Sequence, residues 1–266
     1  MAAEQLARRR LILILVAFHP SAQEVAALQV CLRQLCAEIG YAVVVNDHCP
    51  GEPVEALFAG ADLHLCHRDN PGYGRAVNRL ARLLPPDLPY LAALNTDLCW
   101  QPGTFERMLA WFDEHPAAVL AVPQIVDPAG RVQRLCKRDP TVLGLFSRRF
   151  LPGPLKPRRL RAYDAWYTMA DADYSTVQAV PYLSGCCMVM RHNPFRAVGG
   201  FDERFFLYLE DADLTRALRT CGDAVHLPLA TVVHAWGRGN HLSLWLTLVN
   251  LSSAWLYFRK WGWRWV

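Results

Sequence analysis

Three acidic residues fall within four positions in the stretch FFLYLEDADLTRAL: Glu210, Asp211 and Asp213. Apolar and aromatic residues precede them, and a helix-like pattern follows. A carboxylate at the start of a helix can cap it, because its oxygens accept hydrogen bonds from free backbone N–H groups. Capping needs one carboxylate, or two. The additional acid, and the aromatic run that delivers all three, indicate a functional site rather than a cap alone.

A fourth acid, Asp97, ends an apolar run in the stretch ALNTDLCWQPG, where Pro102 and Gly103 then introduce a helix. A carboxylate held in a short turn at the end of a strand can reach a divalent cation. Such a cation prefers hard oxygen ligands and usually keeps phosphate oxygens of the substrate among them. The alternative that the sequence leaves open is an aspartate that only stabilises the turn.

A glycine-containing turn lies in RDNPGYGRAVNRL, where Asn70, Gly72 and Gly74 come just before a helix carrying Arg75 and Asn78. Glycines let the backbone approach a ligand closely, and the N-terminus of a helix attracts anions. The spacing differs from that of the dinucleotide-binding fingerprint. An ordinary loop is therefore the alternative to a ligand-binding turn.

Apolar runs and helix-like segments alternate through the first half of the chain. We expect strands at residues 11–17, 41–45, 62–66, 90–94 and 119–123, a later strand at 185–190, and helices at 22–38, 74–84 and 103–114. This alternation predicts βαβ units and a mostly parallel sheet. Ligands bind beyond the carboxyl ends of such strands. That rule directs attention to three segments: Phe18-His19-Pro20, Asn46-Asp47-His48 and Asn95-Thr96-Asp97.

The composition fits one large domain, or one domain with an appendage: 266 residues, 53% of them hydrophobic. A net charge of +4 is too mild to suggest nucleic acid as a partner. The nine cysteines are an odd number without zinc or redox spacing, which favours a reducing, cytoplasmic compartment. The start of the chain has a basic segment and an apolar run, like a signal peptide. That run is short and lacks a cleavage pattern, so we expect a buried first strand there.

Two segments depart from the alternation. Residues 147–162, SRRFLPGPLKPRRLRA, hold three prolines and six basic residues without an acid. They predict a mobile basic insert that extends to about residue 176. The apolar, tryptophan-rich segment 241–266 contains polar residues that argue against a membrane span. A helix lying on a membrane surface and a helix packed on the domain both fit it.

With these motifs in order, the chain resembles the family 2 glycosyltransferases of the GT-A fold, and among them the bacterial rhamnosyltransferase-like members. The similarity runs from residue 11 to about 260, and GGFDERFFLYLEDADLTRALRTCG is its most specific part. The stretches LNTDL, NPGYGRAVN and SSAWLYFRKWG add to it. The resemblance implies an α/β fold with a Rossmann-like, mostly parallel central sheet flanked by helices and a C-terminal helical extension. Residues 1–240 would form the catalytic domain and 241–266 an amphipathic helix.

The resemblance also implies catalytic roles. Asp211 matches the catalytic base of the family, and an inverting transfer needs one carboxylate to take the proton of the acceptor hydroxyl. Glu210 would orient the acceptor or the loop, and Asp213 would cap the helix. The basic residues from Arg148 to Arg161 could contact a diphosphate on the donor or on a lipid-linked acceptor, with a solvated insert as the alternative.

For the donor, the resemblance implies a metal motif that keeps one acid here, Asp97, beside the neutral Asn95. His234 stands where some relatives place a metal-binding histidine, and a structural histidine is the alternative. Asp97 and His234 would hold Mg²⁺ or Mn²⁺. The residues implied to bind the nucleotide sugar are His19, Asp47, Gly74, Asn78, Asn95, Asp97 and Gly185.

The expected function is inverting transfer of a sugar, with rhamnose from dTDP-rhamnose as the expected case, to a lipid-linked or cell-surface glycan precursor. The enzyme would be cytoplasmic and peripheral on the inner face of the cell membrane. A nucleotidyltransferase is one alternative, although LVAFHPSAQE lacks the glycine- and lysine-rich first loop of such enzymes. A non-catalytic nucleotide-sugar binder is the other, because Asn95 replaces an acid of the metal motif.

Overall fold

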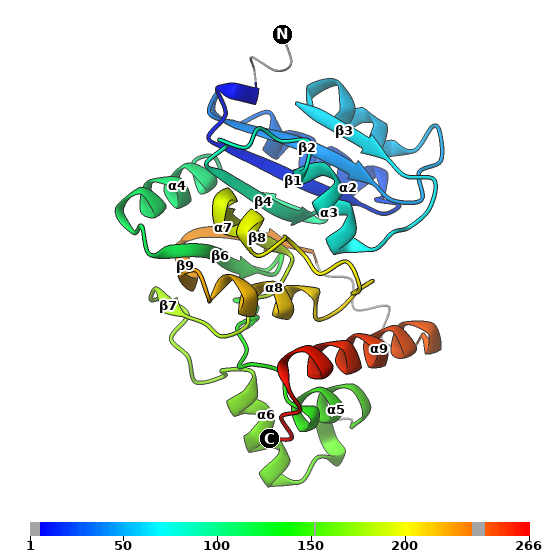
Figure 1. The fold of residues 1–266 in the computed structure, drawn as a ribbon, viewed down its shortest axis with the longest axis vertical. Helices are drawn as coiled ribbons and strands as arrows, with labels where there is room; N and C mark the ends of the chain where they lie inside the picture. The colour runs from blue at the N-terminus through cyan, green and yellow to red at the C-terminus, as the bar shows by residue number, and fades with distance from the viewer. Residues whose placement is uncertain (1–5, 152, 236–242) are drawn as a thin grey trace.

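A mixed β-sheet flanked by helices forms the centre of the molecule (Figure 1). The computed structural model describes residues 6–151, 153–235 and 243–266. Within them, the sheet has nine strands in the order β3-β2-β1-β4-β8-β6-β9-β5, with β7 paired to β9. The strands are β1 (Leu11–Ala17), β2 (Ile39–Val45), β3 (Leu63–Cys66), β4 (Tyr90–Asn95), β5 (Leu98–Trp100), β6 (Ala118–Val126), β7 (Gln178–Ala179), β8 (Cys187–Arg191) and β9 (Asp223–His234).

The first half of the sheet is parallel, as the alternation predicts. β1 pairs with β2 and β4, and β2 with β3, all in parallel. The β1 sequence LILILVA is buried at every position, as expected for a parallel strand covered on both faces. The predicted strands are all present, with ends shifted by a few residues. The three-residue β5 and two-residue β7 are too short to produce a pattern in the sequence.

Strand β8 lies between β4 and β6 and runs antiparallel to both. Leu94 pairs with Cys187, and the Asn95 N–H donates to the Cys186 carbonyl at 3.0 Å. An antiparallel strand begins where its partner ends. The segment just before β8 therefore lies beside the carboxyl end of β4.

The helices differ more from the prediction than the strands do. The helix expected at 22–38 ends at Leu32, because the chain must turn to bring Ile39 beside Leu11. Its start is fixed by a capping box between Ser21 and Glu24. The helices are α2 (Ala22–Leu32), α3 (Tyr73–Ala81), α4 (Thr104–Glu114), α5 (Val142–Phe150), α6 (Arg158–Tyr167), α7 (His192–Ala197), α8 (Glu210–Leu218) and α9 (Leu244–Trp261), with 3-10 helices η1 (Pro53–Gly60) and η2 (Gly153–Leu155).

The expected loop at 147–162 is wrong in its secondary structure, because α5, η2 and α6 occupy most of the segment. Residue 152 lies outside the described residues. Pro154 falls in η2, and Pro157 is the residue just before α6, so neither interrupts an α-helix. The Lys156 ammonium meets the Asp164 carboxylate at 2.5 Å. The mobility of this insert stays a prediction.

Helix α9 packs against α8 through the third acid of the opening stretch. Asp213 is 1% exposed and accepts hydrogen bonds from Lys260 Nζ at 2.8 Å and from Trp261 Nε1 at 2.7 Å. The expectation that Asp213 caps α8 is therefore wrong: Leu209 is the N-cap residue, and Asp213 connects α8 to α9. The expected boundary between the domain and this helix, residues 240–241, lies outside the described residues.

We expect Asp213→Ala to lower the free energy of unfolding by about 2–4 kcal/mol, because it leaves the Trp261 N–H without its buried acceptor and the Lys260 ammonium with Asp202 alone, at 3.1 Å. Urea unfolding measures this change. The control is Glu38→Gln, which removes an exposed partner of Arg10 at 3.6 Å and should cost less than about 1 kcal/mol. Equal losses in the two variants would show that Asp213 does not hold α9 in place.

Candidate functional site

Two of the residues predicted to bind the nucleotide sugar lie side by side at the carboxyl edge of the parallel strands. His19 follows β1, Asp47 follows β2, and His19 Nε2 lies 3.1 Å from Asp47 Oδ2. His19 Nδ1 also meets Glu52 Oε1 at 2.5 Å. Hydrogen bonds to Glu52 and then to Asp47 raise the pKa of His19. The backbones of His19 and Asp47 have φ values of 46° and 55°, a strained conformation of the kind that clusters at ligand-binding loops.

Asp97 and His234 are brought together by the pairing of β5 with β9, in which Leu98 lies opposite His234. His234 Nε2 is 3.0 Å from Asp97 Oδ2. The second oxygen of Asp97 and the Nδ1 of His234 are buried without a hydrogen-bond partner in the described part of the chain. The Asp97 side chain stays 22% exposed, so the pair is not sealed from solvent. Asn95, at the end of β4, is partly exposed beside this turn.

This pair fits the ligand set of a divalent cation. Adjacent ligands of an octahedral ion with bonds of about 2.1 Å lie about 3 Å apart, which matches the spacing of the two side chains. The second oxygen of Asp97, which has no hydrogen-bond partner among the described residues, could bind the same ion as a further ligand atom. In the described residues, no group of three or more His, Cys, Asp or Glu side chains is arranged to hold a metal. An ion held by Asp97 and His234 would therefore need the rest of its ligands from substrate and water.

Asp211 is the one acid of the opening stretch that is not buried. Three donors fix its carboxylate: the Tyr182 hydroxyl at 3.1 Å, the Gly185 N–H at 2.9 Å and the Ala212 N–H at 2.8 Å. Only Ala212 belongs to α8, so the carboxylate also accepts hydrogen bonds from residues outside its own helix. Gly185 has little room for a side chain, because an added Cβ would lie 3.0 Å from Asp211 Cβ. The predicted residues Gly185 and Asp211 are thus in direct contact.

The segment before β8 connects the two acidic centres. Gly185 donates to Asp211, and the next residue, Cys186, accepts from the Asn95 N–H at 3.0 Å. Burial raises the pKa of the Cys186 thiol to about 12, and the carboxylates of Asp97 and Asp211 both add to the rise. Both acids therefore lie near Cys186, at the edge of the sheet where β4 ends and β8 begins.

Glu210 differs from its neighbour in burial. Its side chain is buried, and Oε2 has no hydrogen-bond partner among the described residues. Burial, and then the adjacent Asp211, raise the pKa of Glu210 to about 8. The preceding residues Tyr208 and Leu209 have φ values of 70° and 63°, so the turn that places these acids is strained. At neutral pH, Glu210 is mostly protonated and Asp211 is the acid open to a ligand.

Lys137 and Tyr182 belong to this site, although the sequence offered no signal for either. Their backbones pair through two hydrogen bonds of 3.0 Å, and Lys137 Nζ lies 4.3 Å from the centre of the Tyr182 ring. Burial lowers the pKa of Lys137 to about 8, while nearby Asp211 opposes this change and Arg148 adds to it. Among the described residues, no carboxylate lies within 4 Å of the Lys137 ammonium. Because Arg148 affects the pKa of Lys137, this residue of the basic insert lies near the site.

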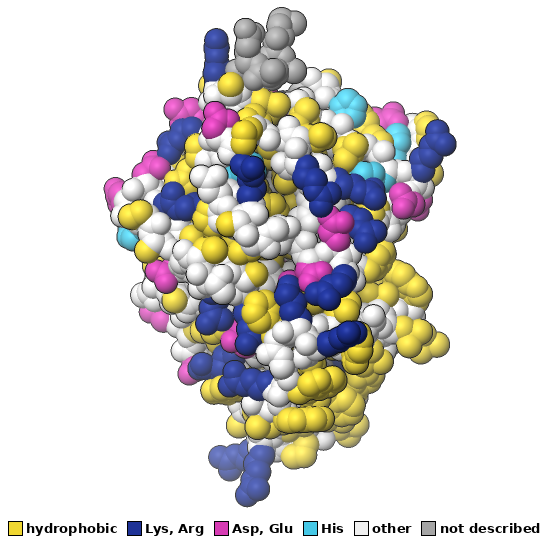
Figure 2. All heavy atoms as spheres, in the orientation of Figure 1, with side chains coloured by type: hydrophobic (Ala, Val, Ile, Leu, Met, Phe, Trp, Pro, Cys, Tyr) yellow, Lys and Arg dark blue, Asp and Glu magenta, His cyan; other side chains and the backbone are white. Residues whose placement is uncertain are grey.

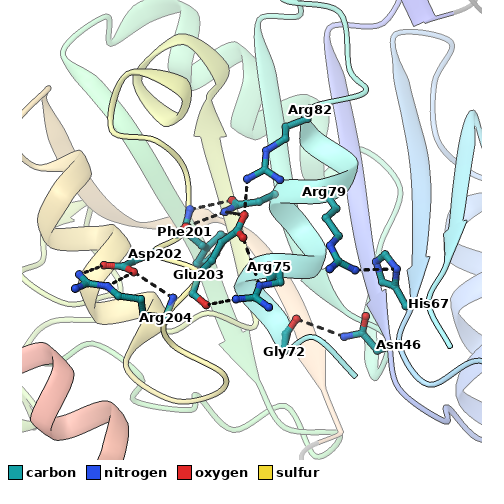
Figure 3. A network of polar contacts seen from close by, with 11 residues as sticks. Asn46, His67, Gly72, Arg75, Arg79, Arg82, Phe201, Asp202, Glu203 and Arg204 are labelled. Carbon is teal, nitrogen blue, oxygen red and sulfur yellow. Dashed lines mark hydrogen bonds and ion pairs between the residues drawn. The ribbon is translucent and has the colours of Figure 1, made fainter. Parts of the chain in front are cut away.

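Gly74 and Asn78, two residues predicted to bind the nucleotide sugar, pack against the loop at residues 201–204. Asn78 is 3% exposed, and its amide donates to the Phe201 carbonyl at 2.8 Å and to Glu203 Oε1 at 3.1 Å while accepting from the Phe201 N–H at 3.0 Å. An added Cβ on Gly74 would lie 2.7 Å from Phe201 Cβ. Figure 3 shows how α3 and the loop at residues 201–204 join through these polar contacts. Both residues hold the loop that leads to the acids, and no amide donor of Asn78 is left for a donor sugar.

The arginines of α3 complete this network. Arg75 and Arg82 both reach Glu203, and Arg79 Nη1 contacts His67 Nδ1 at 3.2 Å (Figure 3). Asn46 Nδ2 donates to the Gly72 carbonyl at 3.5 Å from the end of β2. The glycine-containing turn therefore connects the carboxyl edge of the sheet, where β2 ends, to the loop at residues 201–204.

Comparison with known proteins agrees with this geometry. Residues 19–199 match the profile of the family described as Glycosyl transferase family 2. An N-acetylglucosaminyl-diphospho-decaprenol L-rhamnosyltransferase of Mycobacterium tuberculosis is 32% identical over 211 residues, which are 70% of this chain and 66% of that protein. The chain thus spans slightly less than two thirds of the length of this relative.

Solved structures share the fold. GalNAc-T7 with UDP, GalNAc and Mn²⁺ has a TM-score of 0.63 at 12% identity, covering 94% of this chain and 47% of the other. The mannosyltransferase PcManGT from Pyrobaculum calidifontis, in complex with GDP-Man and Mn²⁺, has a TM-score of 0.58 at 14% identity, covering 88% and 59%. The expected GT-A α/β fold is confirmed. Because the family profile covers more than half of the chain, the protein belongs to glycosyl transferase family 2.

Proposed function

We propose that this protein is an inverting glycosyltransferase that moves a sugar from a nucleotide-diphosphate donor to a hydroxyl of a lipid-linked glycan precursor. The observation that carries the proposal is the state of Asp211. Its carboxylate is partly open to solvent and held by three hydrogen bonds, beside a segment that leads to the Asp97–His234 pair. A fixed, accessible carboxylate within reach of a cation site suits general-base catalysis on a phosphate-linked donor.

The reaction exchanges one bond at the anomeric carbon. The acceptor hydroxyl oxygen attacks this carbon, the bond to the donor phosphate oxygen breaks, and the leaving nucleoside diphosphate takes the electron pair. The hydroxyl proton passes to Asp211. Tyr182 and Gly185 hold the carboxylate in one orientation, so little reorganisation is needed when the proton arrives. Glu210 is mostly protonated at neutral pH and is therefore a poor base. Its buried side chain would help to hold the turn at Tyr208 and Leu209.

The donor would lie along the carboxyl edge of the sheet, with His19, Asp47 and Asn95 toward the nucleoside and Asp97 and His234 toward the diphosphate. A cation held by Asp97 and His234 would neutralise charge on the leaving diphosphate. The imidazole ligand favours Mn²⁺ over Mg²⁺, which prefers oxygen ligands. Lys137 and Arg148 add positive charge on the Asp211 side, where a diphosphate of a lipid-linked acceptor could lie.

The rhamnosyltransferase relative supports the choice of substrates. Its name describes a diphospho-decaprenol acceptor and an L-rhamnosyl group. We therefore propose dTDP-rhamnose as the donor and a polyprenyl diphosphate sugar as the acceptor. A lipid-linked acceptor would place the reaction at the inner face of the cell membrane.

Loss of the base should stop transfer without weakening donor binding. We expect Asp211→Asn to lower the rate of rhamnosyl transfer to a short-chain prenyl diphosphate N-acetylglucosamine by at least about 100-fold. The dissociation constant of dTDP, measured by calorimetry, should change by less than about threefold, because Asp211 does not contact the nucleotide. The exposed Asp171→Asn is the control. Tight dTDP binding by a wild-type protein that transfers nothing would instead identify a non-catalytic binder.

The cation pair can be tested by binding alone. We expect His234→Ala and Asp97→Asn each to weaken Mn²⁺ binding in the presence of dTDP by about 10–100-fold, since each removes one of the two protein ligands. Electron paramagnetic resonance of free Mn²⁺ measures this. His115→Ala, at the residue that follows α4, is the control. Unchanged Mn²⁺ affinity in both site variants would exclude the pair as the metal site.

Stability should depend on pH through Glu210. The pKa of Glu210 is raised to about 8 in the folded state. Its contribution to the free energy of unfolding is therefore fully present below the ordinary pKa of about 4.5 and is lost as the pH rises toward 8. We expect the melting temperature of the wild type to fall by roughly 5 °C more than that of Glu210→Gln between about pH 5 and pH 8. Glu38→Gln should follow the wild type. Parallel curves for wild type and Glu210→Gln would show that Glu210 ionises normally.

A further inference from the structure

Helix α9 is apolar on both of its faces. The inner face packs on the domain through buried Ser253, Tyr257 and Phe258. The outer face carries Leu244, Leu248, Leu251 and Trp255 at helical spacing, and Leu244 is 82% exposed. A helix that is apolar all round is normally buried on every side. The amphipathic character expected for residues 241–266 stays a prediction. The outer face of α9 lacks a covering element among the described residues.

The insert extends this outer face. Phe146 and Phe150 are exposed on α5, with ring centroids 5.1 Å apart. The tail after α9 joins α5 through hydrogen bonds from the Val142 N–H to the Arg264 carbonyl at 2.8 Å and from the Leu143 N–H to the Trp265 carbonyl at 3.1 Å. We call the result the α5–α9 face, made of Phe146, Phe150, Leu155, Leu244, Trp245, Leu248, Leu251, Trp255, Trp263, Trp265 and Val266.

Apolar side chains are concentrated on this face. Of the 18 large apolar residues exposed in the described chain, 11 belong to it. Figure 2 shows a large yellow area at the lower right, over the position of α9 in Figure 1. The others are scattered over the domain. Contiguous apolar surface of this kind marks a site of interaction, whereas scattered residues do not.

The charge around the face has one sign. Residues 142–163 and 243–266 contain no aspartate or glutamate. Apart from Lys260, whose ammonium pairs with Asp213 and Asp202, the exposed basic residues of these segments are Arg148, Arg158, Arg159, Arg161, Arg259 and Arg264. Arg259 lies over the Trp255 ring at 5.0 Å. Exposed tryptophan and leucine bordered by arginine fit the boundary between acyl chains and anionic headgroups better than a protein surface.

The α5–α9 face is joined to the loop at residues 205–209, which leads into α8. The Trp245 ring meets the Phe206 ring at 5.4 Å, and Ser253 Oγ donates to the Leu207 carbonyl at 2.8 Å. Tyr257 and Phe258 share a buried cluster with Leu209 and Tyr182. Within the described residues, no helix has both the length and the apolar character needed to cross a bilayer. Contact with lipid would therefore be along the surface.

We propose that the α5–α9 face docks on a lipid bilayer that carries anionic headgroups, with the apolar side chains in the acyl boundary and the arginines among the phosphates. Docking would hold the loop at residues 205–209, which leads into α8 and Asp211, close to the membrane. The proposal deepens the proposed function, from which it takes the lipid-linked acceptor, but its contacts do not depend on the reaction.

Co-sedimentation of the full chain with vesicles tests it. We expect the wild type to bind phosphatidylcholine vesicles containing phosphatidylglycerol, and to bind pure phosphatidylcholine at least about fivefold more weakly. Leu248→Gln/Leu251→Gln should lower the partition coefficient by at least about tenfold. Arg158→Glu/Arg159→Glu should reduce binding to the anionic vesicles only.

Two control variants match these changes elsewhere on the surface. Val30→Gln/Leu83→Gln alters residues that are 55% and 57% exposed on the far part of the domain, and Arg8→Glu/Arg33→Glu makes the same charge change there. Both should bind vesicles like the wild type. Equal binding by the Leu248/Leu251 variant and the wild type would overturn the proposal. So would a dimer in light scattering that this variant abolishes, because a second copy would then cover the face.

Transfer to a short-chain, water-soluble acceptor separates this inference from the proposed function. Vesicle binding that depends on the face, without any such transfer, would support the docking surface and count against the enzyme activity. Transfer without vesicle binding would support the enzyme activity and overturn the docking surface.

Discussion

The site depends on one strand running in the opposite direction from its neighbour. β8 is antiparallel to β4, so its first residues lie where β4 ends, and the Asn95 N–H binds the Cys186 carbonyl. This single pairing brings the turn that carries Asp97 next to the segment that holds Asp211. A parallel β8 would begin at the other edge of the sheet and leave the two acids apart.

Three acids within four residues have three different environments, and each environment gives a different chemical state. Asp213 is buried but paired with Lys260 and Trp261, so it serves as the attachment point of α9. Glu210 is buried without a charged partner, and its pKa rises to about 8. Asp211 alone reaches solvent, while donors from two segments fix its orientation. The charge that seemed excessive for a cap thus has three explanations: attachment of α9 for Asp213, a buried carboxyl for Glu210, and the proposed general base for Asp211.

The same attachment connects the surface to the site. Because α9 is held to α8 at Asp213 and to the loop before α8 at Leu207, its outer face is connected through these contacts to the helix that carries Asp211. The basic insert is part of this body rather than a separate loop, since α5 pairs with the tail that follows α9. Binding to a membrane and access of a lipid-linked acceptor would thus involve the same packed set of helices, α5, α8 and α9.

The sequence by itself determined the main strands of the sheet, and it singled out the acids and the sheet edge on which the proposed function depends. Buried parallel strands such as β1 are continuous apolar runs, and polar residues that follow such runs stand out. Tertiary structure alone decided how these residues divide the work. Asn78 and Gly74 follow a ligand-binding pattern, but packing against Phe201 uses them to position a loop. Lys137 shows no pattern at all, because its role comes from burial beside Tyr182 and Asp211. The pairing of Asp97 with His234 joins residues 137 positions apart, and only the register of β5 on β9 sets their distance.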